Sequence, residues 1–198
     1  MLAAPVPLGE AARVAALRSL RVLDTLPEER FDRIARLACR IFDAPMASIA
    51  LVDEQREWSK ARQGVDAQNL ARELSIAAHV ILQDRAWVAA DLLTDARFAD
   101  HPLVVGPAQW RACAAYPVHA ADGARVGALC VLDQRPRDYT ALELASLADL
   151  AALVDAELLT QSQSPTDELT GLANRRGFMA LATHLLAACR RSGRPATL

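Results

Sequence analysis

Hydrophobic positions near the start of the chain recur at the spacing of an α-helix. Val14, Leu17 and Leu20 lie three residues apart, which predicts a helix over residues 8–23. A second row of this kind predicts another helix over residues 28–42. Both rows are amphipathic, so each helix is expected to lay one face on a common core.

After Pro45 the pattern changes from helical to strand-like. The apolar run 46–52 predicts a buried strand, and the more polar run 57–64 predicts its partner at a sheet edge. The strongest signal is Asp122-Gly123 between the apolar runs 110–119 and 125–133, because Asp-Gly favours the tight turn of a hairpin. Run 125–133 is apolar on both faces, which predicts a sheet covered on both sides.

A long helix is predicted over residues 141–161. Thr140 and Glu143 form a capping box at its start, and residues 162–166, which contain Pro165, form a short linker after it. Apolar residues follow the helix in a heptad-like row, namely Leu144, Leu147, Ala151, Val154 and Leu158. This row either packs on the sheet or meets a partner helix. Because Leu150 and Leu153 lie on an adjacent face, the helix has apolar groups for both contacts, and we expect a homodimer through it.

Net charge, the length of apolar runs and the cysteine spacing limit the classes of function that fit this sequence. The chain has 198 residues, with 22 Lys+Arg against 24 Asp+Glu, a formal net charge of −2 that argues against nucleic acid or an anionic membrane as partner. No apolar run approaches the ~18 residues of a membrane span, and the start lacks the pattern of a signal peptide. Four scattered cysteines without a CxxC pair fit neither a zinc site nor a disulfide framework, so we expect no bound metal and a cytoplasmic location.

The segment DELTGLANRRGF, residues 167–178, resembles the opening of a GGDEF domain, the catalytic module of diguanylate cyclases. Every fixed position of the family pattern D-x-L-T-G-L-x-N-R-R-x-F is matched. The matching residues are Asp167, Leu169, Thr170, Gly171, Leu172, Asn174, Arg175, Arg176 and Phe178. By this resemblance they form a structural entry turn into that domain.

Upstream, several segments resemble a GAF domain of the class that precedes GGDEF modules. They include LRVLDTLPEERFDRIARLA, ASIALVDEQREWSKARQG and RVGALCVLDQRPR. The resemblance implies an α+β fold, a PAS-like antiparallel sheet flanked by helices, with a long C-terminal signalling helix. The expected division is an N-terminal helical lead (1–14), a GAF domain (15–160) with the exit helix (141–161), a linker (162–166) and the N-terminal fragment of a GGDEF domain (167–198).

Together these resemblances imply a sensory module of a cyclic di-GMP signalling protein. An intact parent would convert two GTP to cyclic di-GMP with Mg²⁺. The family's metal-binding aspartates and its Gly-Gly-Asp/Glu-Glu-Phe loop do not occur in residues 1–198, so this chain should be inactive alone and need no cofactor. The alternatives are a non-enzymatic GAF dimerisation module and, more weakly, a GAF redox enzyme.

A small-molecule pocket needs aromatic or apolar walls with a few polar groups. The residues that meet this description are Trp58, His79, Trp110, Arg111, Cys113, Tyr116, Cys130 and Asp133. Each also has a structural interpretation. His79, in a short helix predicted after a Ser75 cap, suits a satisfied core histidine better than a ligand. The register predicted from the hairpin pairs Cys130 with Ala115 and leaves Cys113 diagonal to it, too far for a disulfide, so buried free thiols are expected.

Overall fold

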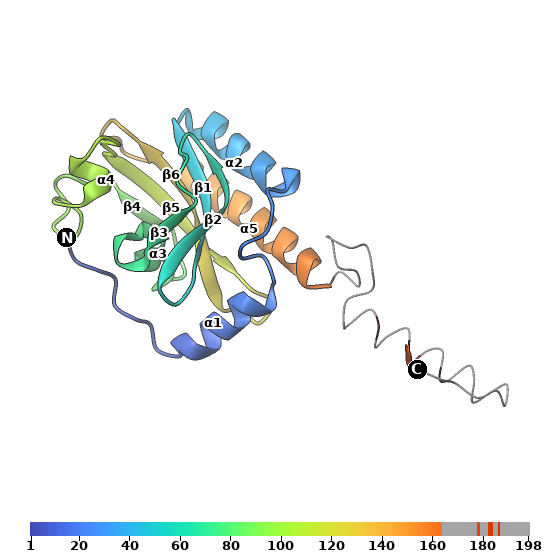
Figure 1. The fold of residues 1–198 in the computed structure, drawn as a ribbon. Helices are drawn as coiled ribbons and strands as arrows, with labels where there is room; N and C mark the ends of the chain where they lie inside the picture. The colour runs from blue at the N-terminus through green and yellow to red at the C-terminus, as the bar shows by residue number, and fades with distance from the viewer. Residues whose placement is uncertain (164–177, 179–181, 184–185, 187–198) are drawn as a thin grey trace. The chain divides into compact units, whose positions relative to one another are not determined.

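The computed structural model describes residues 1–163, 178, 182–183 and 186 (Figure 1). Residues Met1–Gln161 form one compact unit, and the sequence from Ser162 onward belongs to a second unit. The elements in chain order are α1 (Glu10–Ser19), α2 (Glu29–Phe42), β1 (Met46–Val52), β2 (Arg56–Gln63), β3 (Asn69–Ala71), the 3₁₀ turn η1 (Arg72–Leu74), α3 (Ile76–Val80), β4 (Trp87–Ala89), α4 (Pro102–Val105), β5 (Ala112–His119), β6 (Arg125–Asp133) and α5 (Ala141–Gln163). The predicted GGDEF-entry turn from Asp167 to Arg176 lies outside the described residues.

A six-stranded sheet in the order β3-β2-β1-β6-β5-β4 forms the centre of the first unit. All neighbouring strands run antiparallel. The hairpin register is as predicted, since Ala115 pairs with Cys130, and Gly123 in the turn has a positive φ of 81° that suits glycine. The α+β class with an antiparallel sheet, flanking helices and a long C-terminal helix is therefore confirmed.

Each face of the sheet carries its own hydrophobic core. On one face, side chains from α1, α2 and α5 pack on residues such as Ile49, Trp58 and Leu129. On the other face, α3, α4 and the loops beside them cover Ala50, Cys130 and their neighbours. Figure 1 shows α2 and α5 on one side of the strands and α3 and α4 on the other. Both faces of residues 125–133 are therefore covered, as their apolar character predicts.

Local signals explain where the helices begin. The Ser75 hydroxyl accepts a hydrogen bond from the Ala78 amide at 2.9 Å and caps α3, as the sequence predicts. At the start of α5 the Thr140 hydroxyl accepts from the Glu143 amide at 3.2 Å, and the Glu143 carboxylate accepts from the Thr140 amide at 2.7 Å. The predicted capping box is therefore formed.

Strand β2, residues 56–63, does not lie at the edge of the sheet, contrary to the prediction. It lies between β1 and the short strand β3, which forms the edge instead. Residue 60 has no partner on β1, where Ala50 pairs with Ser59 and Ile49 with Ala61, so Lys60 is the extra residue of a β-bulge. Lys60 faces the helices, as Trp58 two residues earlier does, and its ammonium donates to the Thr25 hydroxyl at 2.6 Å and pairs with Glu28. The bulge brings the next residue, Ala61, to the same face.

The observed bounds of other helices and strands differ from the predicted bounds by a few residues. Helix α1 is shorter than the predicted 8–23, because its backbone leaves the helix at Leu20 and Arg21 has a positive φ of 54°. The predicted polar loop at 65–74 contains β3 and η1, and α5 includes the first two residues assigned to the linker. No helix in the described part of the chain is long and apolar enough to cross a membrane.

The row predicted as a dimer seam on α5 faces the core of the same chain. Leu147, Ala151, Val154 and Leu158 are buried there, and Leu144 packs against them. Of the two leucines on the adjacent face, Leu150 is buried and Leu153 is half exposed. A partner helix would therefore contact α5 through its outer face rather than through this row.

Leu147 is expected to contribute far more to folding than Leu142 on the same helix. Leu147 is fully buried and Leu142 is 78% exposed. Replacing Leu147 with Ala should lower the free energy of unfolding by about 2–5 kcal/mol, because a cavity remains in the core. The matched Leu142→Ala change should stay within ~0.5 kcal/mol of wild type in urea unfolding. Equal losses for both variants would contradict the assignment of faces on α5.

Candidate ligand pocket

A cavity of about 70 Å³ lies between the second core and the edge of the sheet. Strands β1, β2 and β6 form its floor, and α3 with the segments 65–70 and 103–110 surrounds it. Most of its wall is apolar, with Met46, Leu70, Ile76, Leu103 and Leu132. The polar residues at its wall are Ser48, Glu57, Ser59 and Asn69. An apolar cavity with a few polar groups is the usual composition of a small-molecule site.

Among the residues that the structure describes, Glu57 is the one titratable carboxyl that borders this cavity. Ser75, the capping residue of α3, donates its hydroxyl to Glu57 Oε2 at 2.5 Å, and the Ala77 backbone amide also donates to the carboxyl. Burial raises the pKa of Glu57 above its ordinary value of 4.5, and these two hydrogen bonds only partly oppose that shift. Glu57 makes no ion pair with any residue in the described part of the chain.

The serine hydroxyls on the cavity floor complete its polar character. Ser48 from β1 and Ser59 from β2 are both buried and project from the same face of the sheet as Glu57. Neither hydroxyl forms a hydrogen bond with a side chain or backbone group of residues 1–163. The Asn69 amide oxygen, by contrast, already accepts from Arg56 Nη1 at 2.9 Å. The cavity thus offers two unused hydroxyls and one carboxyl.

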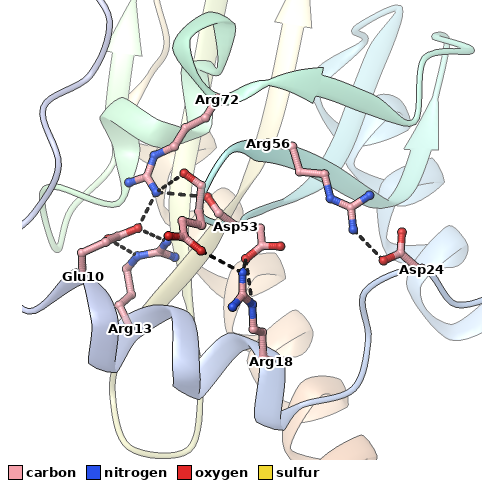
Figure 2. A network of polar contacts seen from close by, with 8 residues as sticks. Glu10, Arg13, Arg18, Asp24, Asp53, Arg56 and Arg72 are labelled. Atoms are coloured by element: carbon pink, nitrogen blue, oxygen red, sulfur yellow. Dashed lines mark hydrogen bonds and ion pairs between the residues drawn. The ribbon is translucent and has the colours of Figure 1, made fainter.

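A polar network holds the segment from which Ser75 reaches Glu57 (Figure 2). Arg72 lies at the start of η1, and its guanidinium pairs with Glu10 of α1 and donates to the Asp53 carbonyl at 3.0 Å. Arg13 of α1 also donates to Glu10, at 2.6 Å. Burial alone would raise the pKa of Glu10, but the hydrogen bonds and charges of both arginines outweigh it and lower that pKa to about 2.

Two further ion pairs in Figure 2 extend this network along the sheet edge. Arg18 of α1 bonds the Asp53 carboxylate at 3.0 Å in the turn between β1 and β2. Arg56 of β2 bonds Asp24 at 2.5 Å, in the connection between α1 and α2. Helix α1 is thereby tied to the β1–β2 turn and to the segment that leads into α3.

The structure brings only two of the eight predicted pocket residues to the cavity. Trp110 and Cys130 line it. Trp58 and Tyr116 belong to the opposite, helix-covered face, because strand residues alternate between faces. Cys113 shares the pocket face of the sheet but lies buried beside the cavity rather than on its wall.

The other three predicted residues make structural contacts. His79 Nε2 bonds the Leu2 carbonyl at 3.1 Å and its ring meets the edge of Phe98, as expected for a satisfied core histidine. Arg111 forms a two-bond ion pair with Asp91, at 2.8 and 2.6 Å. Asp133 accepts from the Arg135 amide at 2.9 Å and closes a turn.

The two buried thiols of the described part of the chain, Cys113 and Cys130, lack the properties of redox catalysis. Cys39, Cys113 and Cys130 are free, and the last two are buried. Burial raises the pKa of both Cys113 and Cys130 well above the ordinary value of 9.0, whereas a reactive thiol needs a lowered pKa and access. Within the part of the chain that the structure describes, no cluster of three or more His, Cys, Asp or Glu residues is arranged to hold a metal ion.

Sequence reasoning missed Glu57, Ser48 and Ser59. It assigned the polar character of strand 57–64 to an exposed edge, although β3 covers that edge along Arg56–Trp58. A usable signal was present, since Glu57 and Ser59 alternate with Trp58 in a strand whose other face is apolar. This alternation places both polar side chains on one face of the sheet.

Glu57→Gln is expected to stabilise the chain at about pH 7.5 and to leave it unchanged at about pH 4. The folded state binds the Glu57 proton more tightly than the unfolded chain does. The stability that wild type draws from this group is therefore complete below its ordinary pKa of 4.5 and is lost as the pH rises through the folded-state pKa. Urea unfolding at both pH values measures the difference. Glu73→Gln, at an exposed position, is the matched control, and a destabilised E57Q chain at the higher pH would refute the raised pKa of Glu57.

Comparisons with known proteins agree with this architecture. A cyclic di-GMP phosphodiesterase of Pseudomonas aeruginosa is 37% identical over 177 residues, which cover 88% of this chain and 30% of that protein. The GAF domain of an Acinetobacter phosphoenolpyruvate-protein phosphotransferase superposes with a TM-score of 0.55 at 18% identity, over 74% of this chain and 92% of that one. The free methionine-R-sulfoxide reductase of Neisseria meningitidis superposes with a TM-score of 0.55 at 14% identity, over 82% and 98% of the two chains.

At such low identities the two structural likenesses establish the fold and nothing finer. A model of the GAF domain matches residues 26–158, which contain α2, the whole sheet and most of α5. The chain therefore belongs to the GAF family.

Proposed function

We propose that this chain is the regulatory GAF module of a protein that turns over cyclic di-GMP. The observation that carries the proposal is the similarity to a cyclic di-GMP phosphodiesterase, which spans 88% of this chain and extends beyond the GAF residues 26–158. The chain spans about 30% of the length of that relative, so catalysis would belong to other parts of such a protein.

Two directions of turnover are compatible with this role. The segment 167–178 resembles the start of a GGDEF domain and favours synthesis from two GTP with Mg²⁺. The relative is named for the opposite reaction, hydrolysis of cyclic di-GMP, and favours breakdown. Both reactions have cyclic di-GMP as a substrate or product. The GAF module would regulate whichever of them the protein that contains this chain carries out.

Helix α5 provides a physical route from the pocket to the residues that come after this helix in the chain. It is anchored on the sheet by Leu147, Val154 and Leu158. Asp155 adds a polar tie, because its carboxylate accepts from the His119 amide at 2.6 Å and contacts His119 Nδ1 at 3.0 Å. A ligand that binds two arrangements of the sheet with different affinity would shift this helix between them.

The protein that contains this chain is expected to form or consume cyclic di-GMP, whereas residues 1–198 alone should do neither. Both reactions are measured by chromatography of the nucleotides, one with GTP and Mg²⁺ and the other with cyclic di-GMP. Appearance or loss of the dinucleotide in either assay supports the proposal and fixes the direction. Absence of both activities from the full protein would refute it.

A non-enzymatic dimerisation module is the second candidate, and the outer face of α5 favours it. Leu142 and Leu153 lie about three turns apart on one side of this helix and are 78% and 51% exposed. Exposed leucines aligned along a helix are typical of a contact with another apolar surface. A homodimer through α5 would bury this face while the inner row remains in the core.

If α5 forms such a dimer, Leu153→Glu should convert the chain to a monomer in sedimentation equilibrium. A charge buried at the contact would lack a partner and oppose association. Leu93→Glu is the matched control, since Leu93 is 44% exposed in a loop between β4 and α4 and should leave the dimer intact. A wild-type chain that is already monomeric at high concentration would rule out the contact.

A further inference from the structure

We propose that the cavity beside Glu57 binds a small organic cation, an amidinium, guanidinium or ammonium group, as the signal of the regulatory module. The inference deepens the proposed function, because it names the chemical class that the module would sense. It rests on the geometry of the cavity and on charge balance around Glu57.

Glu57 lacks a cationic partner within residues 1–163. The arginines nearest in sequence are already engaged elsewhere, Arg56 with Asp24 and Arg72 with Glu10. Glu57 is partly buried, and a carboxylate held largely away from water without a counter-charge favours taking up a proton or pairing with a cation. A cationic ligand entering the cavity would supply the charge that the described residues do not.

The Glu57 carboxyl also has hydrogen-bonding capacity that the protein does not use. An ionised carboxylate has about four acceptor sites. Ser75 and Ala77 occupy two of them in the described structure, which leaves capacity for donors from the cavity side. Amidinium and guanidinium groups present two parallel N–H donors that suit this arrangement.

The other residues of the cavity wall can contact the part of the ligand that does not pair with Glu57. The Ser48 and Ser59 hydroxyls border the cavity and can accept further N–H groups. Trp110 adds an aromatic ring, a surface that attracts cations and packs against flat groups. No arginine, lysine or histidine borders the cavity among the described residues, so no positively charged side chain there would attract an anion.

Cavity size limits the ligand to a few non-hydrogen atoms or to the charged end of a larger molecule. Its volume of about 70 Å³ is roughly half that of a ~150 Å³ cavity that holds benzene. Acetamidinium, acetamide and acetate share nearly the same planar shape at this scale and differ in charge. They therefore separate charge from shape in one experiment.

Ligand binding would also act on α3. A cation next to Glu57 favours the carboxylate form, and hydrogen bonds from Ser75 and Ala77 to a charged acceptor are stronger than to a neutral one. Ser75 caps α3, and Arg72, three residues earlier, joins the network to α1. Occupation of the cavity would thereby tighten the segment that connects α1 to α3.

The test is a titration of the ¹⁵N-labelled chain with each of the three compounds, followed through its amide resonances. Acetamidinium should shift the Ser48, Ser59 and Ala77 resonances saturably, whereas acetamide and acetate should not. Glu57→Gln should weaken binding by about tenfold or more, because a charge-assisted contact is lost, and Glu73→Gln should leave binding unchanged. The affinity of wild type should rise with pH as Glu57 ionises.

Equal responses to acetamidinium and acetamide, undiminished binding to the E57Q chain, or no saturable response to acetamidinium would each overturn the proposal. The amide spectrum of the E57Q chain shows directly whether it is folded. The nucleotide assays of the parent protein are independent of this titration. A failure of cation binding and a failure of cyclic di-GMP turnover are therefore distinguishable.

Discussion

The central strands β1, β5 and β6 bury side chains on both faces, and the rest of the fold depends on this constraint. Apolar groups on both faces must be removed from water, so a layer has to cover each side. Helices α1, α2 and α5 cover one face with a large continuous core. The other face is covered by shorter elements, α3 and α4 with their loops, which leave room for a cavity.

The cavity occupies the part of this second layer where polar residues replace apolar ones on the sheet. Ser48, Glu57 and Ser59 project into it from adjacent strands. The Ser48 and Ser59 hydroxyls have no partner among residues 1–163, and polar side chains in an otherwise apolar layer contribute little to folding, so binding is the role proposed for them. The polar network of Glu10, Arg13 and Arg72 keeps the covering segment in place over this region.

Helix α5 combines its place in the core with the signalling route proposed for it. Its inner face completes the first core, and the Asp155–His119 contact fixes it to the end of β5. A movement of the sheet would therefore be passed to the helix rather than absorbed between them. The outer face keeps Leu142 and Leu153 exposed and is available for a partner.

The sequence by itself determined the elements whose signals are local. The hairpin at Gly123, the capping box at Thr140 and the Ser75 cap depend on residues a few positions apart, and each was predicted correctly. Only the tertiary structure decided which face of each strand meets the cavity, because that depends on pairing between distant segments. For the same reason Trp58 and Tyr116 were expected in the pocket and lie in the opposite core, whereas Glu57, assigned to an exposed edge, borders the cavity.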